Sequence, residues 1–148
     1  MTTGRIETTV SIDNTPEAVM NYVADIRNRP LFLGPLKSVT DIQGEPTAEG
    51  TRWKWIWAAL GMEFEGSGQC LKHEPGKLYR FRTEGGIAST WTYTAEPAGN
   101  GTRLTIAVEY EVPQRAAGRL PTGAVAEKMK KAEADRVAEN LQVILSRS

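Results

Sequence analysis

The chain of 148 residues contains one cysteine, Cys70, and one histidine, His73. A single cysteine excludes a disulfide within the chain, and it also excludes a Cys-x-x-Cys redox or metal motif. With one residue of each type, the sets of histidine and cysteine ligands that usually hold zinc cannot form. We therefore expect no metal site, and the low cysteine content fits a reducing compartment.

Net charge is also lacking, because 18 Lys and Arg residues balance 18 Asp and Glu residues. A balanced chain has no general attraction for nucleic acid or for anionic membranes. No run approaches the roughly 18 apolar residues of a membrane span, and residues 1–5 lack the apolar run of a signal peptide. We expect a cytoplasmic protein with no nucleic-acid partner and no membrane insertion; a homodimer is compatible with the sequence.

The composition is that of an ordinary globular protein. Hydrophobic residues make up 40% of the chain and charged residues 24%, so disorder is not indicated. A chain of this length suits one domain and needs no covalent staple to bury a core. We therefore expect a single domain over residues 1–148.

Apolar and polar residues alternate over residues 5–13, which predicts a strand with one buried side. The run Asn14-Thr15-Pro16 follows and is typical of a helix start, because proline suits the first turn. Similar alternation predicts further strands at 39–42, 51–57, 63–71, 78–83, 87–95 and 104–112.

Opposed residues of a hairpin point to the same side of a sheet. The pairs that we expect to be opposed are Trp57 with Phe64, Cys70 with Tyr79, Thr83 with Ile87, and Ala95 with Thr102. All four pairings place the apolar residues on one common face, which predicts an antiparallel meander.

Residues 124–148 contain neither proline nor glycine. Apolar side chains recur there on one side at helical spacing, namely Ala126, Ala134, Val137, Leu141 and Ile144, flanked by Met129 and Leu145. A helix of this length spans about 37 Å, enough to cross a sheet. Together the elements predict an α+β fold: a curved antiparallel sheet of about seven strands wrapped around a long C-terminal helix, with one or two short helices after the first strand.

Several short stretches add to this pattern. They are Ile-Asp-Asn-Thr-Pro-Glu-Ala-Val at 12–19, Ala-Asp-Ile at 24–26 with Asn28 and Pro30, Gly-Thr-Arg-Trp at 50–53, Glu-Pro-Gly-Lys-Leu at 74–78 and Gly-Thr-Arg-Leu-Thr at 101–105. In this order they resemble the START-like, or Bet v 1-like, superfamily (SRPBCC), which includes polyketide cyclase/dehydrase-like proteins. The resemblance implies the helix-grip fold over nearly the whole chain, but no single function, since the superfamily holds carriers, cyclases, receptors and chaperone activators.

The predicted inner face of the sheet is rich in aromatic residues. We expect the ligand-binding residues to be Trp53, Trp55, Trp57, Phe64, Tyr79, Phe81, Trp91, Tyr93 and Tyr110, with Met129 from the helix. Gly66 and Gly68 on the same face, opposite the alanines of the helix, favour a cavity over a filled core. We expect Ala126 and Ala134 to lie near these glycines, although the glycines could instead mark a bend or a close approach.

The remaining reactive residues have simpler interpretations. Cys70 is expected to be a small buried residue, and His73 to lie at a hairpin tip. Glu63 and Glu65 share a face with Arg80 and Arg82, which is typical of a solvated face with cross-strand charge pairs. The phenols of Tyr79, Tyr93 and Tyr110 could each orient a ligand or reach solvent.

Three classes of function stay open. The first is binding or transport of an apolar small molecule, such as a lipid, isoprenoid or aromatic polyketide, in an internal cavity. The alternative is a polyketide cyclase or dehydratase that acts in the same cavity without metal or organic cofactor, for which the sequence identifies no catalytic residue. A protein-interaction module is the third. A titratable group directed into the cavity would favour the enzyme.

Overall fold

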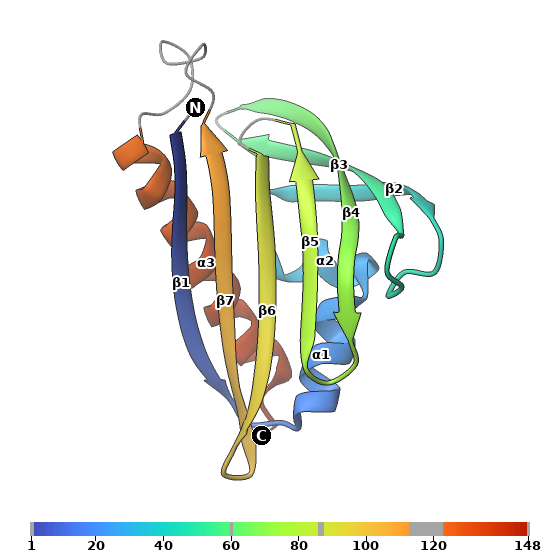
Figure 1. The fold of residues 1–148 in the computed structure, drawn as a ribbon, viewed down its shortest axis with the longest axis vertical. Helices are drawn as coiled ribbons and strands as arrows, with labels where there is room; N and C mark the ends of the chain where they lie inside the picture. The colour runs from blue at the N-terminus through green and yellow to red at the C-terminus, as the bar shows by residue number, and fades with distance from the viewer. Residues whose placement is uncertain (1, 60, 86–87, 113–122, 148) are drawn as a thin grey trace.

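The computed structural model describes residues 2–59, 61–85, 88–112 and 123–147. Within these residues seven strands form one antiparallel sheet in the order β1-β7-β6-β5-β4-β3-β2 (Figure 1). The strands are β1 (Thr2–Ile12), β2 (Leu36–Gln43), β3 (Arg52–Ala59), β4 (Met62–Glu74), β5 (Leu78–Glu84), β6 (Ala88–Ala98) and β7 (Gly101–Val112). This sheet confirms the predicted antiparallel architecture.

The helices lie on one face of this sheet (Figure 1). They are α1 (Pro16–Ala24), the 3-10 turn η1 (Ile26–Asn28), α2 (Arg29–Phe32) and the long α3 (Gly123–Leu145). The start of α1 is the predicted one: the backbone N–H of Ala18 donates to the hydroxyl of Thr15 at 3.2 Å, and Pro16 occupies the first turn. None of the described helices has the length and apolar character of a membrane span.

Helix α3 packs against β1 and β7, at one end of the strand order. Ala126, Ala134, Val137 and Leu141 are buried as expected, but Ile144 is exposed. Gly66 and Gly68 belong to β4, towards the other end of the sheet. The expectation that the alanines of α3 lie near these glycines is therefore wrong, because the helix covers the opposite part of the sheet.

The hairpin registers were only partly predicted. Trp57 pairs with Phe64 as expected. The other three pairings are displaced by two residues: Cys70 faces Phe81, Thr83 faces Ser89, and Ala95 faces Leu104, while Ile87 lies outside the described residues. A displacement of two keeps every side chain on its predicted face, because strand side chains alternate with a period of two.

One irregularity in β4 changes a face. A bulge at Leu71 lies between the pairs Cys70–Phe81 and Lys72–Arg80, and the next pair is His73–Tyr79. The bulge inserts one residue, so Cys70 and His73 both share the inner side of the sheet although they are three residues apart. His73 was expected at a hairpin tip, and this prediction is wrong because the strand continues to Glu74.

Candidate ligand-binding site

Six of the predicted ligand-binding residues are buried side chains of the inner face. They are Trp53, Tyr79, Phe81, Trp91, Tyr93 and Tyr110, which come from β3, β5, β6 and β7. The rings of Phe81 and Trp91 are nearly parallel, with 6.2 Å between centroids and 7° between planes. Tyr93 continues this array on the same strand as Trp91, at 6.3 Å. We call Trp53, Phe81, Trp91 and Tyr93 the aromatic wall.

The other four predicted residues are half-buried or exposed and lie outside this wall, as do the buried Tyr79 and Tyr110. Trp55 and Trp57 are half-buried on β3, whereas Phe64 is 43% exposed and Met129 on α3 is 44% exposed. Met129 does not share the buried side of α3. The structure thus brings together only part of the predicted set.

Tryptophan rings occupy the space above the inward-facing glycines. Trp53 is the register partner of Gly68, and Trp55 is the partner of Gly66. A Cβ atom on either glycine would overlap the opposite indole. These glycines make room for indoles, so they do not by themselves create a cavity as the sequence analysis favoured.

Arg29, which the sequence analysis did not select, is the unexpected member of this region. It begins α2, yet only 2% of its surface is exposed. Its guanidinium carbon lies 4.1 Å from the ring centroid of Phe81 and 5.3 Å from that of Trp53. The ring of Tyr79 stands 5.5 Å away. Three aromatic rings therefore surround a buried cation.

The hydrogen bonding of this guanidinium is incomplete. Nη2 donates to the carbonyl of Val23 at 3.4 Å. Among the described residues, Nε and Nη1 have no acceptor, although both are buried. Arginine keeps its charge in proteins, and a buried charge without a partner is costly even when aromatic faces offset part of the penalty. The region therefore carries a positive charge that the described residues do not neutralise.

Two further buried polar atoms belong to Tyr79, which contacts Arg29, and to His73, which packs against Tyr79. The hydroxyl of Tyr79 makes no hydrogen bond of normal geometry in the described part of the chain, although it lies close enough to Arg29 and Cys70 to interact with both. Burial raises the pKa of this phenol, and the Arg29 charge acts in the opposite direction. His73 packs edge-on against Tyr79, with 5.6 Å between ring centroids, and its Nε2 is also buried without a partner. Native interiors satisfy nearly all buried polar groups, so this concentration needs an explanation.

Helix α3 adds titratable groups to its buried side. Lys130 and Glu133 form an ion pair at 3.4 Å, and their side chains are largely buried. Helical spacing places both on the side of Ala126, Ala134 and Val137. Burial raises the pKa of Glu133, and the nearby Lys130 only partly opposes this effect. No group of three or more His, Cys, Asp or Glu side chains in the described ranges is arranged to hold a metal ion.

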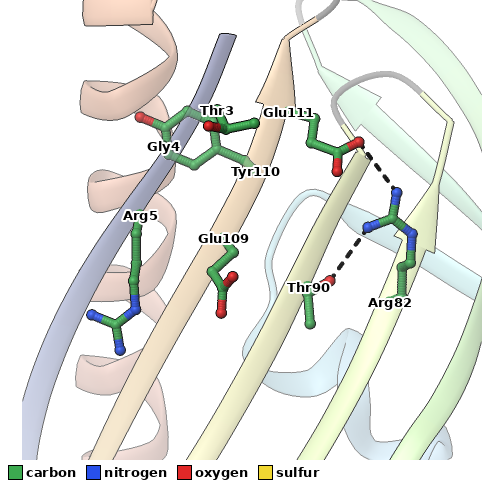
Figure 2. Close-up of a pocket in the computed structure, with 8 residues that line it drawn as sticks. All are labelled: Thr3, Gly4, Arg5, Arg82, Thr90, Glu109, Tyr110 and Glu111. Carbon is green, nitrogen blue, oxygen red and sulfur yellow. Dashed lines mark hydrogen bonds and ion pairs between the residues drawn. The ribbon is translucent and has the colours of Figure 1, made fainter. Parts of the chain in front are cut away.

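Two surface pockets lie away from the aromatic wall. One, of about 420 Å³, is lined by charged residues of the outer sheet face and by Tyr110 (Figure 2). Arg82 there contacts Glu111 and Thr90, each at 3.4 Å. The other, of about 570 Å³, lies between β1 and α3. Charge pairs of this kind are the solvated outer face that the sequence predicted.

Comparison with protein families decides the identity of the scaffold. Residues 3–145 match the family described as polyketide cyclase/dehydrase and lipid transport. The chain belongs to this family. No curated protein matches the sequence.

Solved structures of low sequence identity agree with the fold. A START superfamily protein from Mycobacterium smegmatis has a TM-score of 0.78 and 14% identity, with 95% of this chain and 96% of that chain covered. The protein TTHA0849 from Thermus thermophilus has a TM-score of 0.77 and 20% sequence identity, with 94% of each chain covered. The Zhui aromatase/cyclase from Streptomyces sp. R1128 has a TM-score of 0.74 and 16% sequence identity, with 97% of this chain and 94% of that chain covered. At these identities the likeness establishes the helix-grip fold alone.

Family membership confirms two predictions. The superfamily resemblance is correct, and the chain is a small-molecule-binding protein of the polyketide cyclase and lipid-transport type. The family does not select among the inner residues, so their roles follow from geometry and chemistry.

Proposed function

We propose that this protein binds a small, planar, largely apolar molecule, such as an aromatic polyketide or an isoprenoid, against the aromatic wall. The observation that carries the proposal is the array of Phe81, Trp91 and Tyr93, whose rings lie within 22° of parallel. Flat ring faces give a planar ligand large contact area with good dispersion and quadrupole interactions. Ligand sites of this kind are mostly apolar with a few fixed polar groups, and Tyr79 and Arg29 supply such groups beside the wall.

Binding without chemistry is the first form of this proposal, and it keeps the cytoplasmic location that the sequence favours. The Cys70 thiol donates to the carbonyl of Lys72 at 3.8 Å. Burial raises its pKa, which lowers its reactivity as a nucleophile. A thiol of this kind is a small core residue.

A cyclase or dehydratase acting in the same place is the second form. One observation favours an enzyme: Glu133 is a largely buried carboxyl group on α3, the helix that packs against β1 and β7, and burial raises its pKa. A carboxyl group whose pKa moves towards neutrality is suited to general acid–base catalysis. Holding a flexible chain in a reactive conformation would supply much of the remaining acceleration.

Fluorescence titration with N-phenyl-1-naphthylamine, an uncharged aromatic probe with a planar naphthalene ring system, tests the proposed binding. We expect saturable binding that Phe81→Leu weakens by about threefold to tenfold, the range for losing one aromatic contact. Phe64→Leu is the matched control, because this phenylalanine is exposed on β4 outside the wall. Each variant is first checked for its unfolding free energy.

Two results would contradict the proposal. One is the absence of any saturable binding, together with native mass spectra in which no small molecule accompanies the purified protein. The other is binding that Phe64→Leu weakens as much as Phe81→Leu. If the protein is a cyclase or dehydratase, Glu133→Gln should abolish turnover of a cyclising substrate and leave the affinity for the probe unchanged.

A further inference from the structure

A buried cation without a counter-charge is the feature that the proposed function leaves unexplained. The carboxylate nearest in sequence, Asp25, is already paired with Arg27, with 2.6 Å between Oδ2 and Nη2. Within the described residues no carboxylate forms an ion pair with Arg29. Its side chain enters the interior from the start of α2, and its position is fixed by three rings and the carbonyl of Val23.

The polar atoms without a partner at and near Arg29 indicate the chemistry of the group that would bind there. Nε and Nη1 carry three N–H donors, and all three lack an acceptor among the described residues. The Tyr79 hydroxyl adds an O–H donor to the same region. Every one of these groups can be satisfied by one kind of partner, an oxygen acceptor, and the charge of the guanidinium favours an oxygen that is negative.

The arrangement of the aromatic rings indicates what the apolar part of the ligand should look like. Phe81 contacts both the guanidinium, at 4.1 Å, and the ring of Trp91, at 6.2 Å between centroids. A molecule whose oxygen meets Arg29 would therefore extend its apolar part along Trp91 and Tyr93. A rigid planar ring fits such a surface better than a flexible chain, because less conformational entropy is lost on binding.

We propose that Arg29 and Tyr79 form an oxyanion-binding subsite at the end of the aromatic wall, and that the ligand is a planar aromatic molecule carrying an anionic oxygen, as in a carboxylate or an enolate. This inference rests on the proposed function and deepens it. The rings hold the guanidinium in place before the ligand arrives, but the subsite is buried, so the side chains that cover it must move aside to admit the ligand. Specificity follows from the same groups, since a ligand that lacks the oxygen leaves them unpaired.

A matched pair of ligands tests the subsite. The probes are 2-naphthoate and methyl 2-naphthoate, which share the ring system and differ in charge, measured by isothermal titration calorimetry at pH 7. We expect the unmodified protein to bind naphthoate about tenfold or more tightly than the ester. Arg29→Met should weaken naphthoate binding by about tenfold to a hundredfold, the range for one hydrogen bond to a charged group, and change ester binding less than twofold or so.

Arg27→Met is the matched control variant. Arg27 is two residues away and largely exposed, so its replacement removes the same charge without touching the wall. We expect it to leave both affinities unchanged. Tyr79→Phe should weaken naphthoate binding several-fold, since one donor to the oxygen is lost. If Arg29→Met does not fold, the selectivity of the unmodified protein and the Tyr79→Phe result decide the question.

The outcomes separate the two proposals. Equal affinity for naphthoate and its ester in the unmodified protein, or equal loss with Arg27→Met and Arg29→Met, overturns the subsite while the aromatic wall stands. Failure of both naphthalene compounds and of N-phenyl-1-naphthylamine to bind overturns the proposed function and the subsite together. Selective naphthoate binding that depends on Arg29 supports both.

Discussion

The indole of Trp53 lies over Gly68, its register partner on the neighbouring strand. The pair is buried, and a Cβ on residue 68 would overlap the five- and six-membered rings of the indole. The absence of a side chain at this position is therefore a requirement of the packing. An aromatic ring over a glycine also shields the glycine backbone of β4 from water.

Gly68→Ala should destabilise the protein by about 1–3 kcal/mol, the usual cost of overpacking a core. Trp53 cannot turn away, because it is enclosed by Phe81 and Arg29. Gly34→Ala is the control: a Cβ there would meet nothing within 4 Å, so this change should be close to neutral. Urea unfolding of both variants measures the difference, and equal stabilities would show that the indole has room to move.

The alternation of apolar and polar residues predicts the faces of the sheet well but the pairing of its strands less well. Faces were predicted correctly through β5, β6 and β7, although their registers were displaced by two residues. The period of two explains both facts: it fixes the side of each residue but not the turn at which two strands pair. The tight turn between β6 and β7, where Ala98 pairs with Gly101, replaced a longer predicted loop.

The site was harder to predict than the fold. The bulge at Leu71 brings His73 to the inner face, and nothing in the local sequence marks it. Arg29 was missed because an arginine before a proline is typical of an exposed turn. A signal did exist: Ile26, Arg29 and Phe32 are spaced by three, which places them on one side of 3-10 and short helical turns, and all three are buried.

Truncation within the α3 packing gives a second prediction. Leu141 is fully buried on the side of the helix that faces the sheet. Leu141→Ala should cost about 2–5 kcal/mol, because it removes apolar contacts and leaves a cavity. Val143→Ala is the control, since Val143 is 81% exposed and should change the free energy of unfolding by less than about 0.5 kcal/mol. Similar losses in both variants would contradict the observed orientation of α3.

The stability of the protein should depend on pH through Glu133. Its pKa in the folded protein is raised by burial, so the stabilising contribution of the protonated form is fully present below about pH 4.3, the unfolded value. That contribution is lost as the pH rises through the raised folded pKa. Glu133→Gln should therefore match the unmodified protein near pH 4 and be more stable at pH 7.

Asp135, which is half-buried on the same helix, should give a pH dependence of stability with the opposite sign. Its hydrogen bond with Lys131, at 2.7 Å, lowers the pKa of the Asp135 carboxyl. Its stabilising contribution is present above about pH 3.9 and is lost as the pH falls through the folded pKa. Asp135→Asn should therefore lose some stability at pH 7 but not at low pH. Unfolding curves across this range test both signs, and parallel pH profiles for the two variants would contradict them.

Arg29 should limit stability in the absence of ligand. Removing a charge from water costs several kcal/mol in a protein interior. A desolvated cation–π contact returns about 2 kcal/mol, so the contacts with the rings offset a part of this cost. The one hydrogen bond to Val23 is long, at 3.4 Å, so it recovers little of the difference. Methionine has a similar length and fills irregular apolar space, which suits the ring-lined region around residue 29.

Arg29→Met should therefore be at least as stable as the unmodified protein when no ligand is present, measured by denaturant unfolding. Arg27→Met, which removes an exposed charge, should change stability by less than about 1 kcal/mol. Saturating 2-naphthoate should reverse the order, because it stabilises only the protein that retains the guanidinium, by an amount set by its affinity. A loss of more than about 2 kcal/mol in ligand-free Arg29→Met would instead make Arg29 a structural residue, held for its ring contacts.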